Sequence, residues 1–137
     1  MQTVLTNAQI VLRDSVIHGS LVIEGDKIEI VDDRQANGNA IDMDGDFIIP
    51  GIIDIHTDNL EKHYFPRPLI DWNPISATIA HDGVCIASGV TTVFDSLSLG
   101  VGAVSGEARE LENLRRLVDG VETADESGAL RAEHFIH

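Results

Sequence analysis

The chain has 137 residues, of which 43% are hydrophobic, and its formal net charge is −14. This length fits one modest domain, or one small unit with part of a larger one. The acidic charge disfavours binding to nucleic acid and to anionic membranes, and no segment is apolar enough to span a bilayer. A single cysteine excludes an intrachain disulfide framework and favours a reducing compartment. With no signal-peptide pattern at the start, we expect a cytoplasmic protein.

The first 49 residues are rich in short apolar segments that predict an antiparallel β-unit. The pair Gly25-Asp26 separates two such segments and is typical of a two-residue hairpin turn. A polar loop at residues 32–40 precedes two further short strands around Asp44-Gly45-Asp46. The expected longer strands are Val4–Leu12, Ser20–Glu24 and Lys27–Val31.

The pattern changes after Pro50-Gly51, where apolar strands alternate with helices. Asn73-Pro74 is typical of a helix start, with Asn as the N-cap and Pro in the first turn. The alternation predicts a parallel sheet with crossover helices. The expected strands are Ile52–Ile55, Thr91–Phe94 and Leu130–Ile136, and the expected helices are Pro74–Ser88, with Ile75, Ile79, Val84 and Ala87 on its buried side, and Ser105–Ala124.

The sequence stops at the end of the third of these strands. Three parallel strands cannot close a barrel, and a complete (β/α)₈ barrel takes roughly 250 residues. A strand edge left bare at this point is unusual for a whole domain. We therefore expect the front portion of a longer protein rather than a small open α/β sheet.

The densest polar cluster follows the first of these strands. In parallel α/β folds, active sites form at the carboxyl ends of the strands. If His56 and Asp58 both continue the strand, their spacing points them the same way, and together they suit a borderline cation such as Zn²⁺. A solvated surface loop is the alternative.

Basic side chains lie close to this cluster, in a chain that has only 9 lysines and arginines. Lys62 and Arg67 could supply positive charge to an anionic substrate, and Asn59 and His63 are further candidates for substrate contacts. The alternative for these residues is an exposed polar turn.

Other polar residues have weaker signals. Asp95 ends the second parallel strand, where it could orient a ligating histidine or cap the next loop. His81 and Asp82 are expected on the outer side of their helix or in local hydrogen bonds, and Cys85 is expected to be a buried, inert thiol. His137 could approach the same rim as His56, but is expected to be frayed.

The segments FIIPGIIDIHTD and ASGVTTVFD resemble the opening of the amidohydrolase superfamily. The longer string HTDNLEKHYFPRP, with AHD at residues 80–82, is similar to the PhnM-type branch of phosphonate metabolism. In this chain Asp58 stands where the superfamily has its second metal-binding histidine.

The resemblance implies an incomplete α/β fold: residues 1–49 as part of a composite β-sandwich and residues 50–137 as the first β-α-β-α-β units of a (β/α)₈ barrel. It also implies a phosphoanhydride hydrolase, a diphosphatase that releases diphosphate from α-D-ribose 1-methylphosphonate 5-triphosphate, with the general base beyond residue 137. His56 and Asp58 would hold a divalent metal, Zn²⁺ first, with Mn²⁺ or Mg²⁺ as alternatives. Asp95 would support the ligands.

The fragment alone would then be inactive, and its exposed edges would favour a homo-oligomer. The partner would be a small phosphorylated sugar, not nucleic acid or membrane. Two alternatives stay open: part of another amidohydrolase that cleaves C–N bonds, such as a dihydroorotase, hydantoinase or deaminase, and a non-catalytic α/β fragment.

Overall fold

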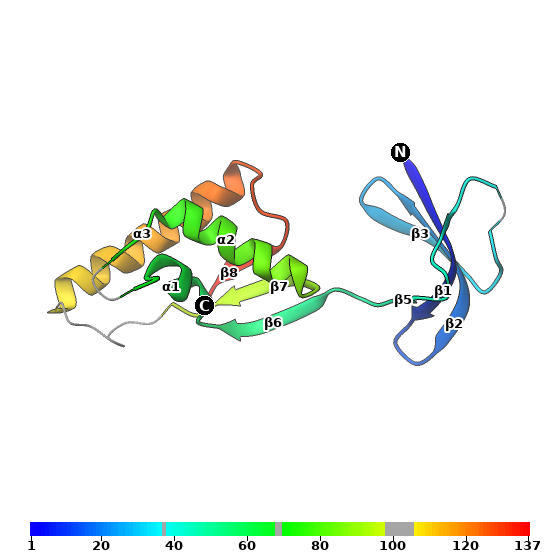
Figure 1. Cartoon of the computed structure of the whole chain (residues 1–137), viewed down its shortest axis with the longest axis horizontal. Coiled ribbons are helices and arrows are strands. Elements are labelled where there is room, and N and C mark those ends of the chain that lie inside the picture. The colour runs from blue at the N-terminus through cyan, green and yellow to red at the C-terminus, as the bar shows by residue number, and fades with distance from the viewer. Residues whose placement is uncertain (37, 68–69, 98–105) are drawn as a thin grey trace. The chain divides into compact units, whose positions relative to one another are not determined.

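The computed structural model describes residues 1–36, 38–67, 70–97 and 106–137, with the backbone alone for residues 106–110. Its contacts divide the chain into two compact units, Met1–Pro50 and Gly51–His137. The elements, coloured along the chain in Figure 1, are β1 (Gln2–Val11), β2 (Val16–Glu24), β3 (Lys27–Asp32), β4 (Ile41–Asp42), β5 (Phe47–Ile48), β6 (Ile52–Thr57), α1 (Asn59–Tyr64), α2 (Pro74–Ala87), β7 (Val90–Asp95), α3 (Gly106–Glu126) and β8 (Glu133–Ile136).

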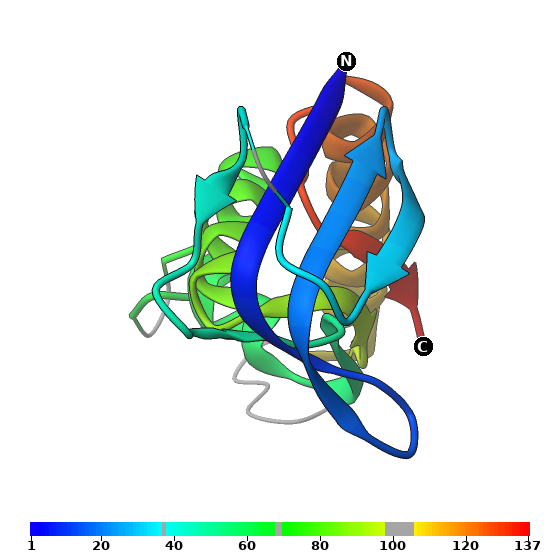
Figure 2. The ribbon, with the colours of Figure 1, turned by 90° about the vertical axis from the view of Figure 1, so that its right-hand side faces the viewer.

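The first unit is a sheet built around β1. Strands β1, β2 and β3 pair antiparallel in chain order, which Figure 2 shows from the side of this unit. Gly25, at the predicted hairpin turn, has a φ of 65° that glycine adopts without strain. Strands β4 and β5 correct the prediction of a purely antiparallel unit, because both pair parallel to β1. Ala8, Ile10 and Leu21 form the small core.

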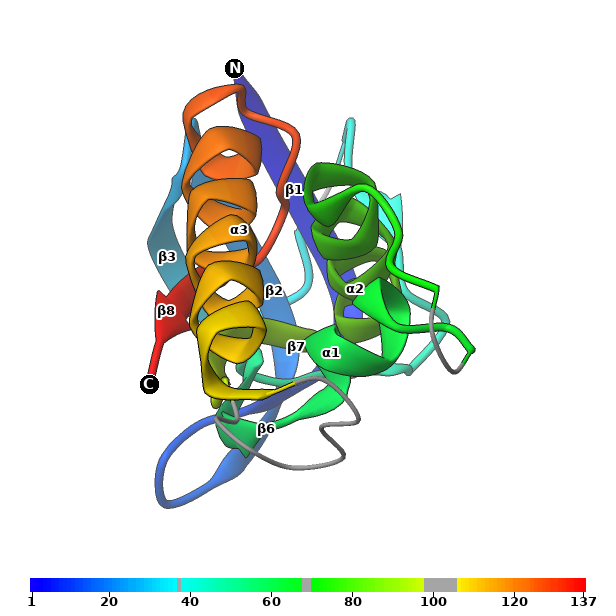
Figure 3. The same ribbon diagram turned by 90° about the vertical axis from the view of Figure 1, so that its left-hand side faces the viewer.

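The second unit is a parallel sheet in the order β6-β7-β8, with helices packed on it. Helices α2 and α3 lie side by side, as Figure 3 shows, and α1 contacts α2. Leu60, Tyr64, Ala77, Leu117 and Val121 form the core between these helices. The prediction of a mixed α/β protein is confirmed, including the parallel strands. The predicted first residue of α3, Ser105, lies outside the described residues.

Helix α2 begins as predicted but buries a different face. The Asn73 side chain accepts a hydrogen bond from the Ser76 amide at 3.0 Å, which confirms the N-cap. The prediction that Ile79 and Val84 face the core is wrong, because they are 41% and 55% exposed. Ala87 is also exposed, and Ile75 is only partly buried. The buried residues are instead Ala77, Thr78, His81, Asp82 and Cys85.

Two local features complete the second unit. The six residues of α1 form a short helix that sequence patterns do not predict, directly after β6. No helix within the described residues is long and apolar enough to cross a membrane.

Two helix glycines give a matched pair of predictions. A Cβ on Gly120 of α3 would lie 2.7 Å from the Pro74 Cβ, whereas one on Gly83 of α2 would meet nothing within 4 Å. We expect Gly120→Ala to destabilise the fold by about 1–3 kcal/mol through overpacking. Gly83→Ala should stabilise it by up to about 1 kcal/mol through helix propensity. Urea denaturation measures both, and equal effects would contradict the close packing of α2 on α3.

Candidate functional site

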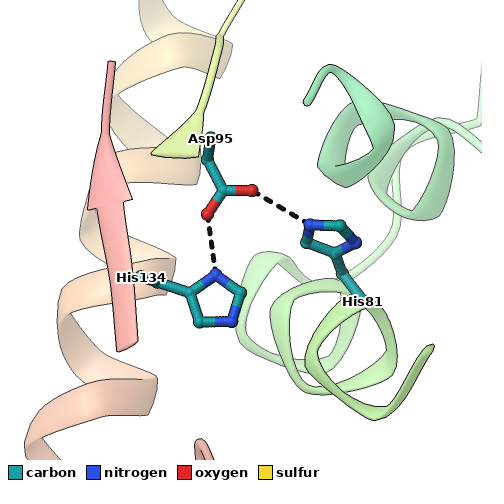
Figure 4. Close-up of side chains that lie close together, drawn as sticks. All are labelled: His81, Asp95 and His134. Carbon is teal, nitrogen blue, oxygen red and sulfur yellow. Dashed lines mark hydrogen bonds and ion pairs between the residues drawn. The ribbon is translucent and has the colours of Figure 1, made fainter. Parts of the chain in front are cut away.

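A buried carboxylate joins two imidazoles between α2 and the parallel sheet. Asp95 ends β7 and is fully buried. Its Oδ1 accepts a hydrogen bond from His81 Nε2 at 3.0 Å, and its Oδ2 accepts one from His134 Nδ1 at 2.7 Å (Figure 4). His81 comes from α2 and His134 from β8, so this one side chain connects three elements.

Asp82 forms the second acidic part of this network. Its Oδ1 accepts the backbone N–H groups of Arg131 and Ala132, at 3.0 and 2.9 Å, just before β8 begins. The same oxygen lies 3.5 Å from His134 Nε2, which is buried and has no hydrogen-bond partner among the described residues. His134 therefore stands between two buried carboxylates.

The electrostatic effects follow from this arrangement. Burial favours a higher pKa for Asp95, but the hydrogen bonds from His134 and His81 outweigh it and lower the pKa below its usual value. Burial opposes the charged form of His134, yet the hydrogen bond to Asp95 and the charges of Asp95 and Asp82 raise its pKa. The pair is thus held as carboxylate and imidazolium over a wider pH range than either group alone.

His81, Asp95 and His134 are also residue types that could hold a metal ion. One ligand atom from each lies within 4.8 Å of the others, and an N,N,O set suits a borderline cation. However, both oxygens of Asp95 already accept hydrogen bonds from imidazole nitrogens. A cation bound to the two imidazole nitrogens nearest Asp95 would displace both of these bonds. We therefore interpret the set as a hydrogen-bonded network.

This network corrects the prediction for His81 and Asp82. His81 and Asp82 do not lie on the outer side of α2, because they are only 2% and 1% exposed and bond to distant residues. Asp95 does bind histidines, but those at positions 81 and 134. Sequence reasoning missed His134. The available signal was the position of this histidine in the predicted strand 130–136, two residues before the strand ends, where alternate side chains share a face.

A second group of polar side chains lies at the carboxyl ends of the parallel strands. His56, from the end of β6, is exposed, and its Nδ1 lies 2.7 Å from Ser96 Oγ. The ring of His137 lies edge-on to that of His56, with centroids 5.7 Å apart. The His137 backbone is held to β7, because its N–H donates to the Asp95 carbonyl at 2.9 Å.

Asp58 does not continue β6, which ends at Thr57, so strand alternation does not set its direction. It precedes α1, and its carboxylate lies 3.7 Å from Lys62 Nζ. Lys62 also donates to Asn59 Oδ1 at 2.7 Å. Arg67 is exposed in the loop after α1. The metal and substrate roles of these residues stay predictions.

A pocket of about 390 Å³ lies beside α1 and α2. Its lining includes three of the predicted substrate-binding residues, Asn59, Lys62 and His63. The buried residues His81 and Cys85 also line it, and burial and the neighbouring His81 lower the pKa of His63.

Cys85 is buried as predicted, and burial, followed by the charge of Asp95, raises the pKa of its thiol. An unreactive thiol is consistent with this.

We predict that Asp95→Asn destabilises the fold by about 3–5 kcal/mol, because it leaves buried imidazoles without their charged partner. Urea denaturation measures the change, and Asp119→Asn, an exposed carboxylate on α3, is the control. EDTA should leave the midpoint of a His56→Ala variant, which lacks the other candidate metal ligand, unchanged if hydrogen bonds alone join these residues. A lower midpoint of that variant in EDTA would show that the network holds a metal.

The same network predicts a pH optimum of stability. The lowered pKa of Asp95 gives stability above its usual value near 3.8, and this stability is lost as the pH falls. The raised pKa of His134 gives stability below its usual value of 6.5, and this is lost as the pH rises through the folded-state pKa. Urea midpoints should peak between about pH 4 and pH 6.5. The peak should flatten in Asp95→Asn, and an unchanged profile in this variant would contradict the assignment.

Comparison with known proteins places this geometry in context. The chain is 37% identical over 135 residues to the alpha-D-ribose 1-methylphosphonate 5-triphosphate diphosphatase of Escherichia coli (strain K12), covering 98% of this chain and 35% of that protein. The crystal structure of an uncharacterized protein has a similar fold, with a TM-score of 0.57, 24% identity and coverage of 99% of this chain and 32% of the other. No family model matches. The resemblance predicted from the motifs is confirmed: the chain is similar, over nearly its whole length, to about a third of a PhnM-type diphosphatase.

Proposed function

We propose that this chain is the N-terminal portion of a metal-dependent hydrolase of phosphonate catabolism that releases diphosphate from α-D-ribose 1-methylphosphonate 5-triphosphate. The observation that carries the proposal is the 37% identity to the diphosphatase of that name, extending over 98% of the chain. Because the chain spans about a third of that relative, the activity belongs to a longer protein in this proposal.

The second unit supports a barrel origin for the fold. Its three strands are parallel and in chain order, with helices α2 and α3 beside the sheet. This is the arrangement expected for consecutive units of a (β/α)₈ barrel. The first unit would then be part of a composite β-sandwich, as the resemblance implies.

The proposed metal ligands are His56 and Asp58, with Zn²⁺ as the first choice of metal. The environment of His56 fits this role, because Ser96 Oγ lies 2.7 Å from its Nδ1. Metal-binding histidines almost always have such an oxygen partner on the other ring nitrogen. A bound metal would polarise a phosphoryl oxygen and lower the pKa of a bound water.

The proposed substrate contacts come from α1 and the loop after it. Lys62 and Arg67 are exposed cations in an acidic chain, and cations neutralise phosphate oxygens. Asn59 and His63 share the pocket with Lys62 and could donate hydrogen bonds to the same anion. In this proposal Asp95 supports the site from the buried side of β7.

We also propose that the isolated chain forms a homo-oligomer. Ile53 and Ile55 on the edge strand β6 are 59% and 74% exposed, and Phe135 on β8 is 47% exposed. Apolar side chains along an unpaired strand edge favour association with another strand.

The test is a chimera in which this chain replaces the matching segment of the E. coli diphosphatase. We expect the chimera to release diphosphate from the ribose triphosphate. His56→Ala should lower kcat/KM by at least roughly 10²-fold, because it removes a metal ligand from the reacting centre. The control is His18→Ala, an exposed histidine of the first unit.

Circular dichroism first establishes that each chimera is folded. A folded chimera that cleaves a cyclic imide but not the triphosphate would replace the proposal with C–N hydrolysis. A folded, active chimera that is indifferent to His56→Ala would contradict the metal role. The isolated chain should release no diphosphate with added Zn²⁺ or Mn²⁺.

A further inference from the structure

The carboxyl ends of the three parallel strands are held close together by backbone hydrogen bonds. The Ser96 N–H donates to the Thr57 carbonyl at 2.7 Å, which connects the ends of β7 and β6. The His137 N–H donates to the Asp95 carbonyl at 2.9 Å, which connects the ends of β8 and β7. The side chains that follow these strands therefore share one edge of the sheet.

Ser96 restrains the imidazole of His56. Its Oγ lies 2.7 Å from His56 Nδ1, a short distance for a neutral hydrogen bond. When this oxygen accepts the Nδ1–H, the tautomer is set and the lone pair lies on Nε2. A ring held in this way loses little further freedom when Nε2 binds a cation.

His137 brings a second imidazole to the same place. Its ring is edge-on to His56 at 5.7 Å and edge-on to Phe94 at 6.4 Å, so it lies beside an aromatic surface. Two imidazoles that share a tetrahedral Zn²⁺ at ~2.0 Å have ring centroids roughly 5 Å apart. Both residues are exposed, so a small rotation of either ring is not opposed by packing.

The other close imidazole pair makes an instructive contrast. The centroids of His81 and His134 are also 5.7 Å apart, but one nitrogen of each ring is hydrogen-bonded to an oxygen of Asp95. At the strand ends, the oxygen on His56 is a hydroxyl and binds the nitrogen that a metal would not use. Exposure also lets a hydrated cation enter.

We propose that His137 is a second imidazole ligand of the divalent metal held by His56, and that Ser96 is a positioning residue for His56. This inference rests on the proposed function, because the metal is the one proposed there. It adds two residues to the site and moves its centre from the β6–α1 junction toward the ends of β7 and β8.

The experiment is a Co²⁺ titration of the chain, followed by d–d absorption and by calorimetry. We expect His137→Ala and Ser96→Ala each to weaken Co²⁺ binding by roughly 10- to 100-fold. His137→Ala removes the imidazole and leaves the backbone in place, so a loss of affinity reports on the imidazole. Ser96→Thr keeps the hydroxyl and should restore the affinity, which a purely structural role of Ser96 would not require.

The controls separate this inference from the proposed function. His18→Ala should bind Co²⁺ as the wild type does, since it removes an exposed histidine of the first unit that is not among the proposed ligands. If His56→Ala loses binding while His137→Ala does not, the inference about His137 is overturned and the metal role of His56 stands. If the wild type takes up no Co²⁺, or if Ser96→Ala binds normally, the inference is overturned, and the diphosphatase proposal is then decided by the chimera alone.

Discussion

The buried carboxylate of Asp95 is the interaction on which the second unit depends. Its two oxygens hold a histidine of α2 and a histidine of β8, and its own strand lies between β6 and β8. The free energy of this arrangement comes from charge-assisted hydrogen bonds in a buried region, where an unpaired carboxylate would be costly. Its backbone carbonyl also accepts the N–H of His137. Asp95 therefore holds α2 to the sheet through its side chain, and connects the ends of β7 and β8 through its backbone and side chain.

The direction of neighbouring side chains then separates two kinds of chemistry. Successive residues of a strand point to opposite faces, so Phe94 and Asp95 lie on opposite sides of β7. The side chains of Asp95 and Val93 lie on the side of the sheet that the helices cover, where both are fully buried. Phe94 stacks on Phe135 at 5.2 Å, and Ser96, just past the end of β7, lies against the exposed ring of His56. The buried network and the exposed imidazole pair are thus two sides of the same strand.

Sequence reasoning succeeded where the signal is local. The Gly25 turn, the Asn73 cap and the alternation of strands and helices each depend on a few adjacent residues. It failed for the buried face of α2. Apolar periodicity predicted that Ile79 and Val84 are buried, whereas His81 and Asp82 are the buried residues. These polar residues are tolerated inside only because partners 14 to 50 positions away satisfy them. Such partners cannot be recognised from helical spacing.

The same distinction explains what was predicted of the candidate site. His56 was predicted because a histidine at the end of an apolar strand is a local pattern, and the resemblance implies the same residue. Ser96 could be proposed as the partner of His56 only after strand order and register were known, since the two residues follow different strands. Because β7 pairs with β6, His56 and Ser96 are hydrogen-bond partners although they lie 40 positions apart in the sequence. A site at the ends of parallel strands is therefore a property of the sheet's register as much as of any motif, and a one-residue slip would turn Ser96 away from His56.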